Sequence, residues 1–203
     1  KHGVCPDAFV VEGPKAGGHL GFHMEQLDNI EDLNYDQEIK DIIGLTKEWE
    51  KQKNCSIPVI VAGGIRNHKD IEHYMNLGAC GVQIASRFVT TKECDAHINF
   101  KNAYISARKE DIMIVKSPVG MPGRAIRNKF IERASLEKIP VTKCHSCLEH
   151  CNQRDIPYCI TDALVNAAKG NVDEGLLFCG ANAYEQNEIT TVREVIEELF
   201  RED

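Results

Sequence analysis

The stretch EGPKAGGHLG at residues 12–21 decides the fold, together with PVIVAGGI at residues 58–65 and GVQIASRF at residues 81–88. Each stretch contains or follows an apolar run that stops at small residues, which is typical of a buried parallel strand whose end approaches a ligand closely. Side chains would shield backbone N–H groups from an anion, so the glycines indicate a phosphate site. One glycine pair alone is more typical of a plain turn, and only the order of the pairs favours the anion site. The expected glycines are Gly17, Gly18, Gly63 and Gly64.

Helical patterns alternate with these strands. Apolar residues recur at helical spacing over residues 36–52, and a helix capped by Asn67 and ended by Gly78 is expected next. Further helices are expected over residues 91–107, 164–169 and 192–200, and a strand over residues 111–115. The alternation of strands and helices predicts an α/β fold built from βα units.

The composition changes after a segment rich in proline and glycine at residues 117–130. From there the chain is rich in helix formers and cysteine, so we place a domain boundary near Gly123. Residues 1–123 are expected to belong to one βα domain and residues 124–203 to a small helical cap.

Composition excludes several functional classes. The formal net charge is -7 and acidic residues are spread along the chain, which argues against nucleic-acid binding, because neutralising phosphates requires a basic face. Neither a membrane-length apolar run nor a secretory signal is present, which favours a cytoplasmic protein. In that compartment the nine cysteines are expected to remain reduced, with the scattered ones packed as ordinary apolar side chains.

The order of the glycine motifs resembles the nitronate monooxygenase family, formerly called 2-nitropropane dioxygenases, and its relative, the flavin-dependent enoyl-acyl-carrier-protein reductase II. The resemblance runs from Asp7 to about Phe130 and returns at PYCITDAL and GANAY. Family members are FMN-binding (β/α)8 barrels, and the matching motifs end their last three strands. A closed barrel needs about 250 residues. The resemblance therefore implies the C-terminal portion of a TIM barrel, completed by an N-terminal part of the same polypeptide.

The resemblance also implies the site residues. His19, in the AGGH motif, is the expected catalytic base or substrate hydrogen-bond partner, because its ordinary pKa lies near working pH; the alternative is a polar loop histidine. Ala85 and Ser86 replace the family's Gly-Thr but keep a narrow site with a hydroxyl. Arg87 is expected to brace the barrel end, and the tail is expected to bring Asn182 or Tyr184 near the substrate. The expected FMN contacts are Glu12, Gly17, Gly18, Gly63, Gly64, Gln83, Ile84, Ala85 and Ser86.

The segment KCHSCLEHCNQRDIPYCI carries four closely spaced cysteines: Cys144, Cys147, Cys151 and Cys159. Four thiolates in one short span suit a zinc ion or an iron-sulfur cluster. Such a metal would tie together a short polar segment that is too poor in apolar residues to build its own core, and would thereby stabilise the cap. The alternative is ordinary packing, since free cysteine is a common buried residue.

The resemblance implies an enzyme, an FMN-dependent oxidoreductase that oxidises alkyl nitronates with dioxygen to a carbonyl compound and nitrite. The same motifs are compatible with an enoyl-thioester reductase that uses FMN and NAD(P)H. A third alternative is an electron-transfer module that uses a cysteine-bound metal. The expected partners are therefore a small-molecule substrate, either a nitronate or an enoyl thioester, and a homodimer is compatible with each reading.

Overall fold

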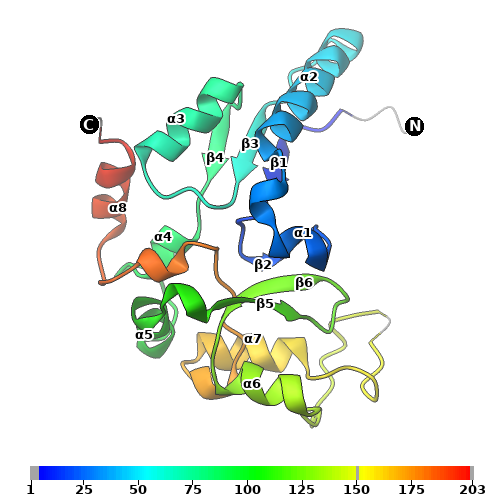
Figure 1. Cartoon of the computed structure of the whole chain (residues 1–203), viewed down its shortest axis with the longest axis vertical. Coiled ribbons are helices and arrows are strands. Elements are labelled where there is room, and N and C mark those ends of the chain that lie inside the picture. Colours follow the sequence, from blue (N-terminus) through cyan, green and yellow to red (C-terminus); the bar gives the residue numbers. More distant parts are fainter. Residues whose placement is uncertain (1–4, 150, 202–203) are drawn as a thin grey trace.

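The computed structural model of this chain describes residues 5–149 and 151–201. A parallel three-stranded sheet forms one half of the molecule, with the strand order β1 (Phe9–Glu12), β3 (Val59–Ala62) and β4 (Gly81–Gln83). The helices α2 (Tyr35–Lys53) and α3 (His68–Leu77) connect these strands and lie in the upper part of Figure 1. The expected βα units are confirmed.

Local chemistry explains where these helices lie and where they stop. Ile39 and Ile43 of α2 are buried against Val59 and Val61 of β3, so one apolar helix face covers the sheet. Asn67 caps α3 by accepting a hydrogen bond from the backbone N–H of Asp70 at 3.1 Å. Gly78 ends α3 at a φ of 106°, which glycine adopts without steric cost. Both expected caps are confirmed.

The first strand is less buried than its sequence predicts. Val10 is 51% exposed and Phe9 is 38% exposed, although both belong to an apolar run. The reason is topological, because within the described residues β1 pairs only with β3 and so forms a sheet edge. Cys5 precedes β1 and is joined by a disulfide to Cys55 beyond α2, so the expectation that all scattered cysteines serve packing is wrong for this pair.

An antiparallel sheet forms the other half of the molecule. Its order is β2 (Gly18–His19), β6 (Pro122–Ile126) and β5 (Ile112–Lys116). The boundary expected near Gly123 lies inside β6, where Gly123 pairs with both His19 and Val115. The sheet therefore continues across this position, because β6 hydrogen-bonds to strands from both sides of it in sequence.

The remaining helical segments surround the two sheets. The helix expected from residue 91 begins only at Ile98, because the His97 side chain accepts the Asn99 N–H and caps the helix there. The expected C-terminal helices are confirmed as α7 and α8. The segments are α1 (Met24–Asp28), η1 (Ile30–Asp32), α4 (Ser86–Val89), α5 (Ile98–Ser106), η2 (Lys109–Asp111), α6 (Lys129–Leu136), α7 (Ile160–Ala168), η3 (Val172–Glu174), η4 (Ala183–Glu185) and α8 (Val192–Leu199).

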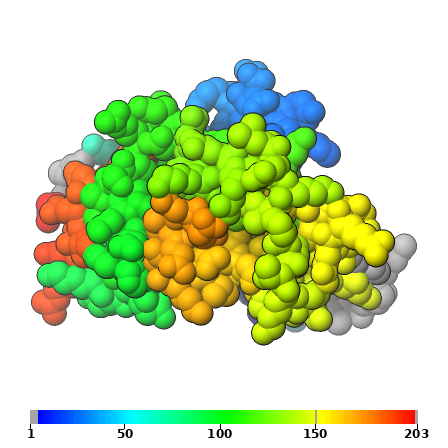
Figure 2. Space-filling view, turned by 90° about the horizontal axis from the view of Figure 1, so that it is seen from below, coloured from blue at the N-terminus to red at the C-terminus, as the bar shows by residue number. Residues whose placement is uncertain are grey.

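The C-terminal part has an apolar core of its own. Phe130 of α6 and Tyr158 are buried with their rings 5.0 Å apart, and Ile160 and Leu176 pack in the same cluster. Tyr158 and Ile160 end the cysteine-rich segment, and they pack in a core that residues outside the segment complete. Figure 2 shows its outer surface, with α6 in yellow-green beside the yellow segment that precedes α7.

The C-terminal tail contacts both halves of the molecule. The Cys179 N–H donates to the Arg124 carbonyl at 3.0 Å, and Ala125 forms an isolated bridge with Phe178. Helix α8 then packs against α3 and α4, at the left of Figure 1. None of the described helices combines the length and low charge that crossing a bilayer requires.

Candidate functional site

A cavity of about 420 Å³ lies at the carboxyl ends of β1, β3 and β4. This end of parallel strands is where α/β proteins usually bind ligands, and the volume falls within the usual range for small-molecule pockets. Every residue expected to contact the cofactor lines this cavity: Glu12, Gly17, Gly18, Gly63, Gly64, Gln83, Ile84, Ala85 and Ser86.

Gly63 and Gly64 are required for close packing of the loops, whereas their sequence suggests only the close approach of an anion. Gly63 and Gly64 have φ values of 99° and 79°, in the left-handed region that side chains disfavour. A Cβ on Gly63 would lie 2.8 Å from the Ala16 backbone nitrogen, and one on Gly64 would lie 2.7 Å from the Cβ of Lys15. Glycine is therefore needed here to pack two strand-end loops together, even before a ligand is considered.

The C-terminal tail closes one side of this cavity. The Gly180 N–H donates to the Ser86 hydroxyl at 3.1 Å, and the Asn182 amide donates to the Gly64 carbonyl at 3.0 Å. Asn182 thus lies at the site, whereas Tyr184 is absent from the cavity wall that the described residues form. Apolar side chains from α4, α5 and the tail form part of the wall: Val89, Phe100, Tyr104 and Phe178.

Arg66 and Arg87 line this cavity and Arg124 contacts one of its loops, and none of the three was predicted as a site residue. Arg87 lines the cavity and braces its surroundings by donating to the Arg66 carbonyl at 2.9 Å and pairing with Glu198. Its Nε is buried without a hydrogen-bond partner in the described part of the chain. Arg124 is 3% exposed and donates to the Ala16 carbonyl, which holds the glycine loop in place. A lone arginine in a Pro-Gly-Arg segment carries no sequence signal for this role.

His19 lies beside the cavity rather than in its wall. Its Nε2 is 2.7 Å from the Ser117 hydroxyl, and its ring meets Phe178 edge-on with ring centres 4.8 Å apart. Phe178 in turn lines the cavity. Burial lowers the pKa of His19, so the neutral imidazole is favoured, and burial raises the pKa of Glu12 at the end of β1. Ser117 had not been predicted, because it is distant from His19 in sequence.

The structure does not gather the four clustered cysteines into one ligand set among the described residues. Cys144 and Cys147 are exposed on a loop, whereas Cys159 is half-buried at the start of α7. The Cys159 sulfur instead lies with ligand atoms of His145 and Asp162, all within 4.8 Å of one another. The described residues thus give no support to a four-cysteine centre, although all four thiols line one cavity of about 280 Å³. The four-cysteine centre and the electron-transfer alternative that depends on it stay predictions.

Comparison with known proteins shows the family of this chain. A family model described as nitronate monooxygenase matches residues 1–202. The chain belongs to the nitronate monooxygenase family. A probable nitronate monooxygenase from Staphylococcus aureus (strain Newman) is 33% identical over 132 residues, which are 64% of this chain and 34% of that protein.

Solved structures share the fold of this nitronate monooxygenase family member. FabK from Thermotoga maritima superimposes with a TM-score of 0.66 at 24% identity, covering 95% of this chain and 53% of that one. A nitroalkane oxidase from Streptomyces ansochromogenes gives a TM-score of 0.63 at 20% identity, over 95% of this chain and 50% of that one. The chain thus spans about a third of the curated relative and about half of each solved chain.

Proposed function

We propose that this chain forms the FMN-binding part of an oxidoreductase that converts alkyl nitronates and dioxygen to a carbonyl compound and nitrite. The observation that carries the proposal is the cavity at the carboxyl ends of β1, β3 and β4, which the three glycine motifs line together. Membership of the nitronate monooxygenase family supports it. In this proposal β1, β3 and β4 are the last three strands of a (β/α)8 barrel, and the C-terminal part is its cap.

The residues of the cavity fit FMN on two counts. The buried Arg87 Nε has no partner in the described chain and lies next to Ser86, so donors are available for a phosphate. Phe100 and Phe178 offer an apolar wall to a planar ring. When bound, FMN would supply the electron transfer between substrate and dioxygen, and the protein would supply positioning and electrostatics.

In this proposal His19 takes the proton from a nitroalkane or orients the nitronate. Burial keeps its imidazole neutral, and therefore able to accept a proton, at pH values near neutrality. The hydrogen bond with Ser117 fixes the orientation of the ring. Phe178 contacts the His19 ring and lines the cavity, which supports a role for His19 at its border.

The test is flavin content combined with nitrite release. The purified protein should be yellow, release FMN on denaturation and form nitrite from an alkyl nitronate in air. His19→Asn should retain FMN and lose about 10²-fold or more of its nitroalkane turnover. His97→Asn is the matched control, because His97 is exposed at the N-cap of α5, where asparagine also caps, and it lines neither this cavity nor the adjoining one. Colourless protein that FMN does not reconstitute, or full activity in His19→Asn, would contradict the proposal.

A second candidate is an enoyl-thioester reductase that uses FMN and NAD(P)H. An adjoining polar cavity of about 410 Å³ favours it, because this cavity shares Lys15, Gly64 and Asn182 with the first and offers space for a second ligand. Lys15 lines both cavities, and its cation suits the phosphates of a nicotinamide nucleotide. Arg66 also lines both cavities, where it pairs with Asp70 and Glu185. Consumption of NAD(P)H that requires an enoyl thioester, without nitrite formation from nitronates, would select this activity.

A further inference from the structure

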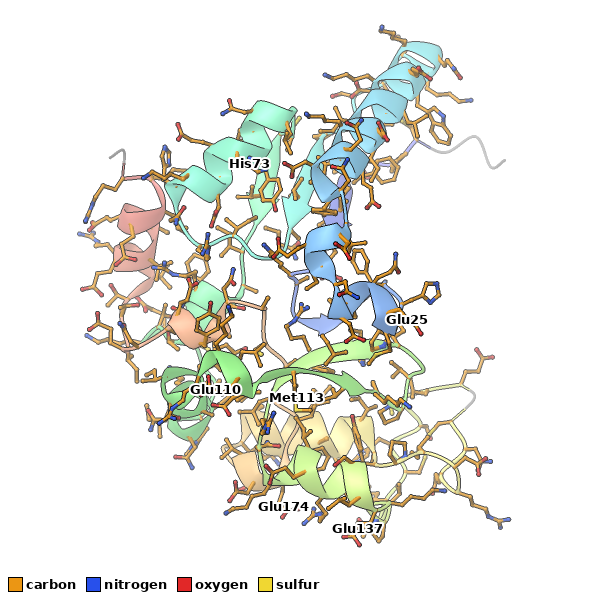
Figure 3. The ribbon with its side chains drawn as sticks, viewed as in Figure 1. Glu25, His73, Glu110, Met113, Glu137 and Glu174 are labelled. Carbon is orange, nitrogen blue, oxygen red and sulfur yellow. A yellow bond between two sulfur atoms is a disulfide. The ribbon has the colours of Figure 1, made fainter. Side chains whose placement is uncertain are left out.

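A cluster of metal-ligand side chains lies outside the proposed flavin site, where the loop after α6 meets α7. The loop starts at Glu137, labelled in Figure 3, and its yellow segment lies at the surface in Figure 2. His145 Nε2 on this loop is 2.7 Å from the Asp162 carboxylate in the first turn of α7. Cys159, the N-cap residue of α7, brings its sulfur to the same place.

The chemistry and spacing of these groups match zinc. Thiolate, imidazole and carboxylate are the three side-chain ligand types that zinc takes in proteins. Tetrahedral zinc with bonds of about 2.0–2.3 Å holds its ligand atoms about 3.3–3.8 Å apart. The ligand atoms of His145, Cys159 and Asp162 lie within 4.8 Å of one another, so rotations of the side chains bring them to that spacing.

Further thiols surround this group. A cavity of about 280 Å³ is lined by His145, Cys159 and three additional free cysteines, Cys144, Cys147 and Cys151. Ser146 adopts a φ of 51° and its N–H donates to the Cys144 sulfur at 3.4 Å, so the loop turns tightly between Cys144 and Cys147. The turn thus holds soft ligands in the cavity that His145 and Cys159 also line. Three protein ligands would leave one position on tetrahedral zinc for such a ligand.

We propose that His145, Cys159 and Asp162 bind one zinc ion, with the adjoining cysteine turn supplying the fourth ligand. On binding, the Cys159 thiol loses its proton to solvent, and the thiolate bonds to the metal. The ion joins the loop to the start of α7. The cluster around Phe130, Tyr158 and Ile160 is a core without metal, so the ion orders the loop and is not needed to fold the C-terminal part. This site is independent of the proposed flavin activity.

Titration of the metal-free chain tests the site. The protein is stripped with a chelator under reducing conditions and titrated with Zn²⁺ by calorimetry, and with Co²⁺ by absorption. We expect one ion per chain, with a thiolate-to-cobalt charge-transfer band and the intense visible bands of tetrahedral cobalt. Far-UV circular dichroism should change little on binding, because the apolar core persists without metal. Substoichiometric binding, or a cobalt spectrum without a thiolate band, would overturn the proposal.

Variants separate this ligand set from a four-thiol centre. Asp162→Asn, His145→Gln and Cys159→Ser should each weaken Zn²⁺ binding by about tenfold or more. Asp155→Asn is the matched control, because Asp155 lies on the same loop and pairs with Asn152 rather than with the cluster. It should bind like the wild type. His145→Gln alters an exposed loop residue, so its binding remains measurable if Cys159→Ser fails to fold. Wild-type affinity for Zn²⁺ in both Asp162→Asn and His145→Gln would overturn the proposal. If Cys144→Ser abolished binding while those two variants bound normally, the ion would be held by thiols alone.

Discussion

Gly64 shows how a single residue limits the site. Its φ of 79° costs an L-residue roughly 1–2 kcal/mol, and its missing Cβ leaves room for the Lys15 side chain. We expect Gly64→Ala to lower the free energy of unfolding by about 1–3 kcal/mol and to weaken FMN binding, measured by urea denaturation and flavin titration. Gly21→Ala is the control, because no heavy atom lies within 4 Å of its added Cβ and its φ is not positive. Equal losses in both variants would refute the packing argument.

His19 gives the site a pH dependence of predictable sign. Burial lowers its folded-state pKa below the ordinary value of 6.5, so the unfolded chain binds its proton more readily. The contribution of His19 to stability is therefore complete above pH 6.5 and decreases as the pH falls from 6.5 towards the folded-state pKa. Urea denaturation at a series of pH values between 6.5 and the folded-state pKa should show that lowering the pH destabilises His19→Asn less than the wild type. Identical pH profiles for the two proteins would mean that His19 is not desolvated.

At the scale of elements, the loop between β1 and β2 is locked against the C-terminal tail. A Cβ on Gly17 would lie 2.6 Å from the Cys179 carbonyl carbon, and backbone cannot move aside as a side chain can. The Ala181 N–H donates to the Lys15 carbonyl at 3.1 Å. This hydrogen bond joins the tail to the loop, so hydrogen exchange at the Ala181 amide reports on their contact.

Gly17→Ala should therefore detach the tail from the loop. Overpacking of this kind costs about 1–3 kcal/mol, so hydrogen exchange at the Ala181 amide should become about tenfold faster or more. Amides of α2, which packs on the parallel sheet through Ile39 and Ile43, should keep their protection. Unchanged exchange at Ala181 would show that the tail is held by other contacts.

At the scale of the whole molecule, α8 connects the last residues of the chain to the first half. Leu199 is 3% exposed, and its carbonyl lies 3.0 Å from the Nδ1 atom of His68 at the start of α3. Phe178, in the tail that leads to α8, also forms a β-bridge with Ala125 of β6. The two sheets are therefore expected to unfold together rather than as separate domains.

Leu199→Ala should reduce the free energy of unfolding by about 2–5 kcal/mol. The fluorescence of Trp49, the single tryptophan, reports on α2, whereas far-UV circular dichroism reports on the whole chain. Both transitions should shift to lower urea concentration by the same amount and remain superimposed. Leu136→Ala is the control, because Leu136 is 88% exposed and its loss should change stability by less than about 0.5 kcal/mol. Separate transitions would indicate two independent domains.

The sequence by itself determined the parallel strands, the helices between them and the glycines of the cavity. These features are local, because apolar periodicity, Asn67 and Gly78 act within a few residues of the element they shape. β6 was missed because Pro122 and Gly123 disfavour strands locally, whereas pairing with β2 and β5 holds this segment extended.

Only the tertiary structure decided which distant residues meet. Ser117 reaches His19 and Asn182 reaches Gly64 across long separations in sequence, and no local pattern encodes such contacts. The cysteine spacing suggested four thiol ligands, but the start of α7 instead sets Cys159 beside Asp162 and His145. The physical reason is the same in each case: strand pairing and core packing position the backbone, and side-chain chemistry then acts between the residues that this brings together.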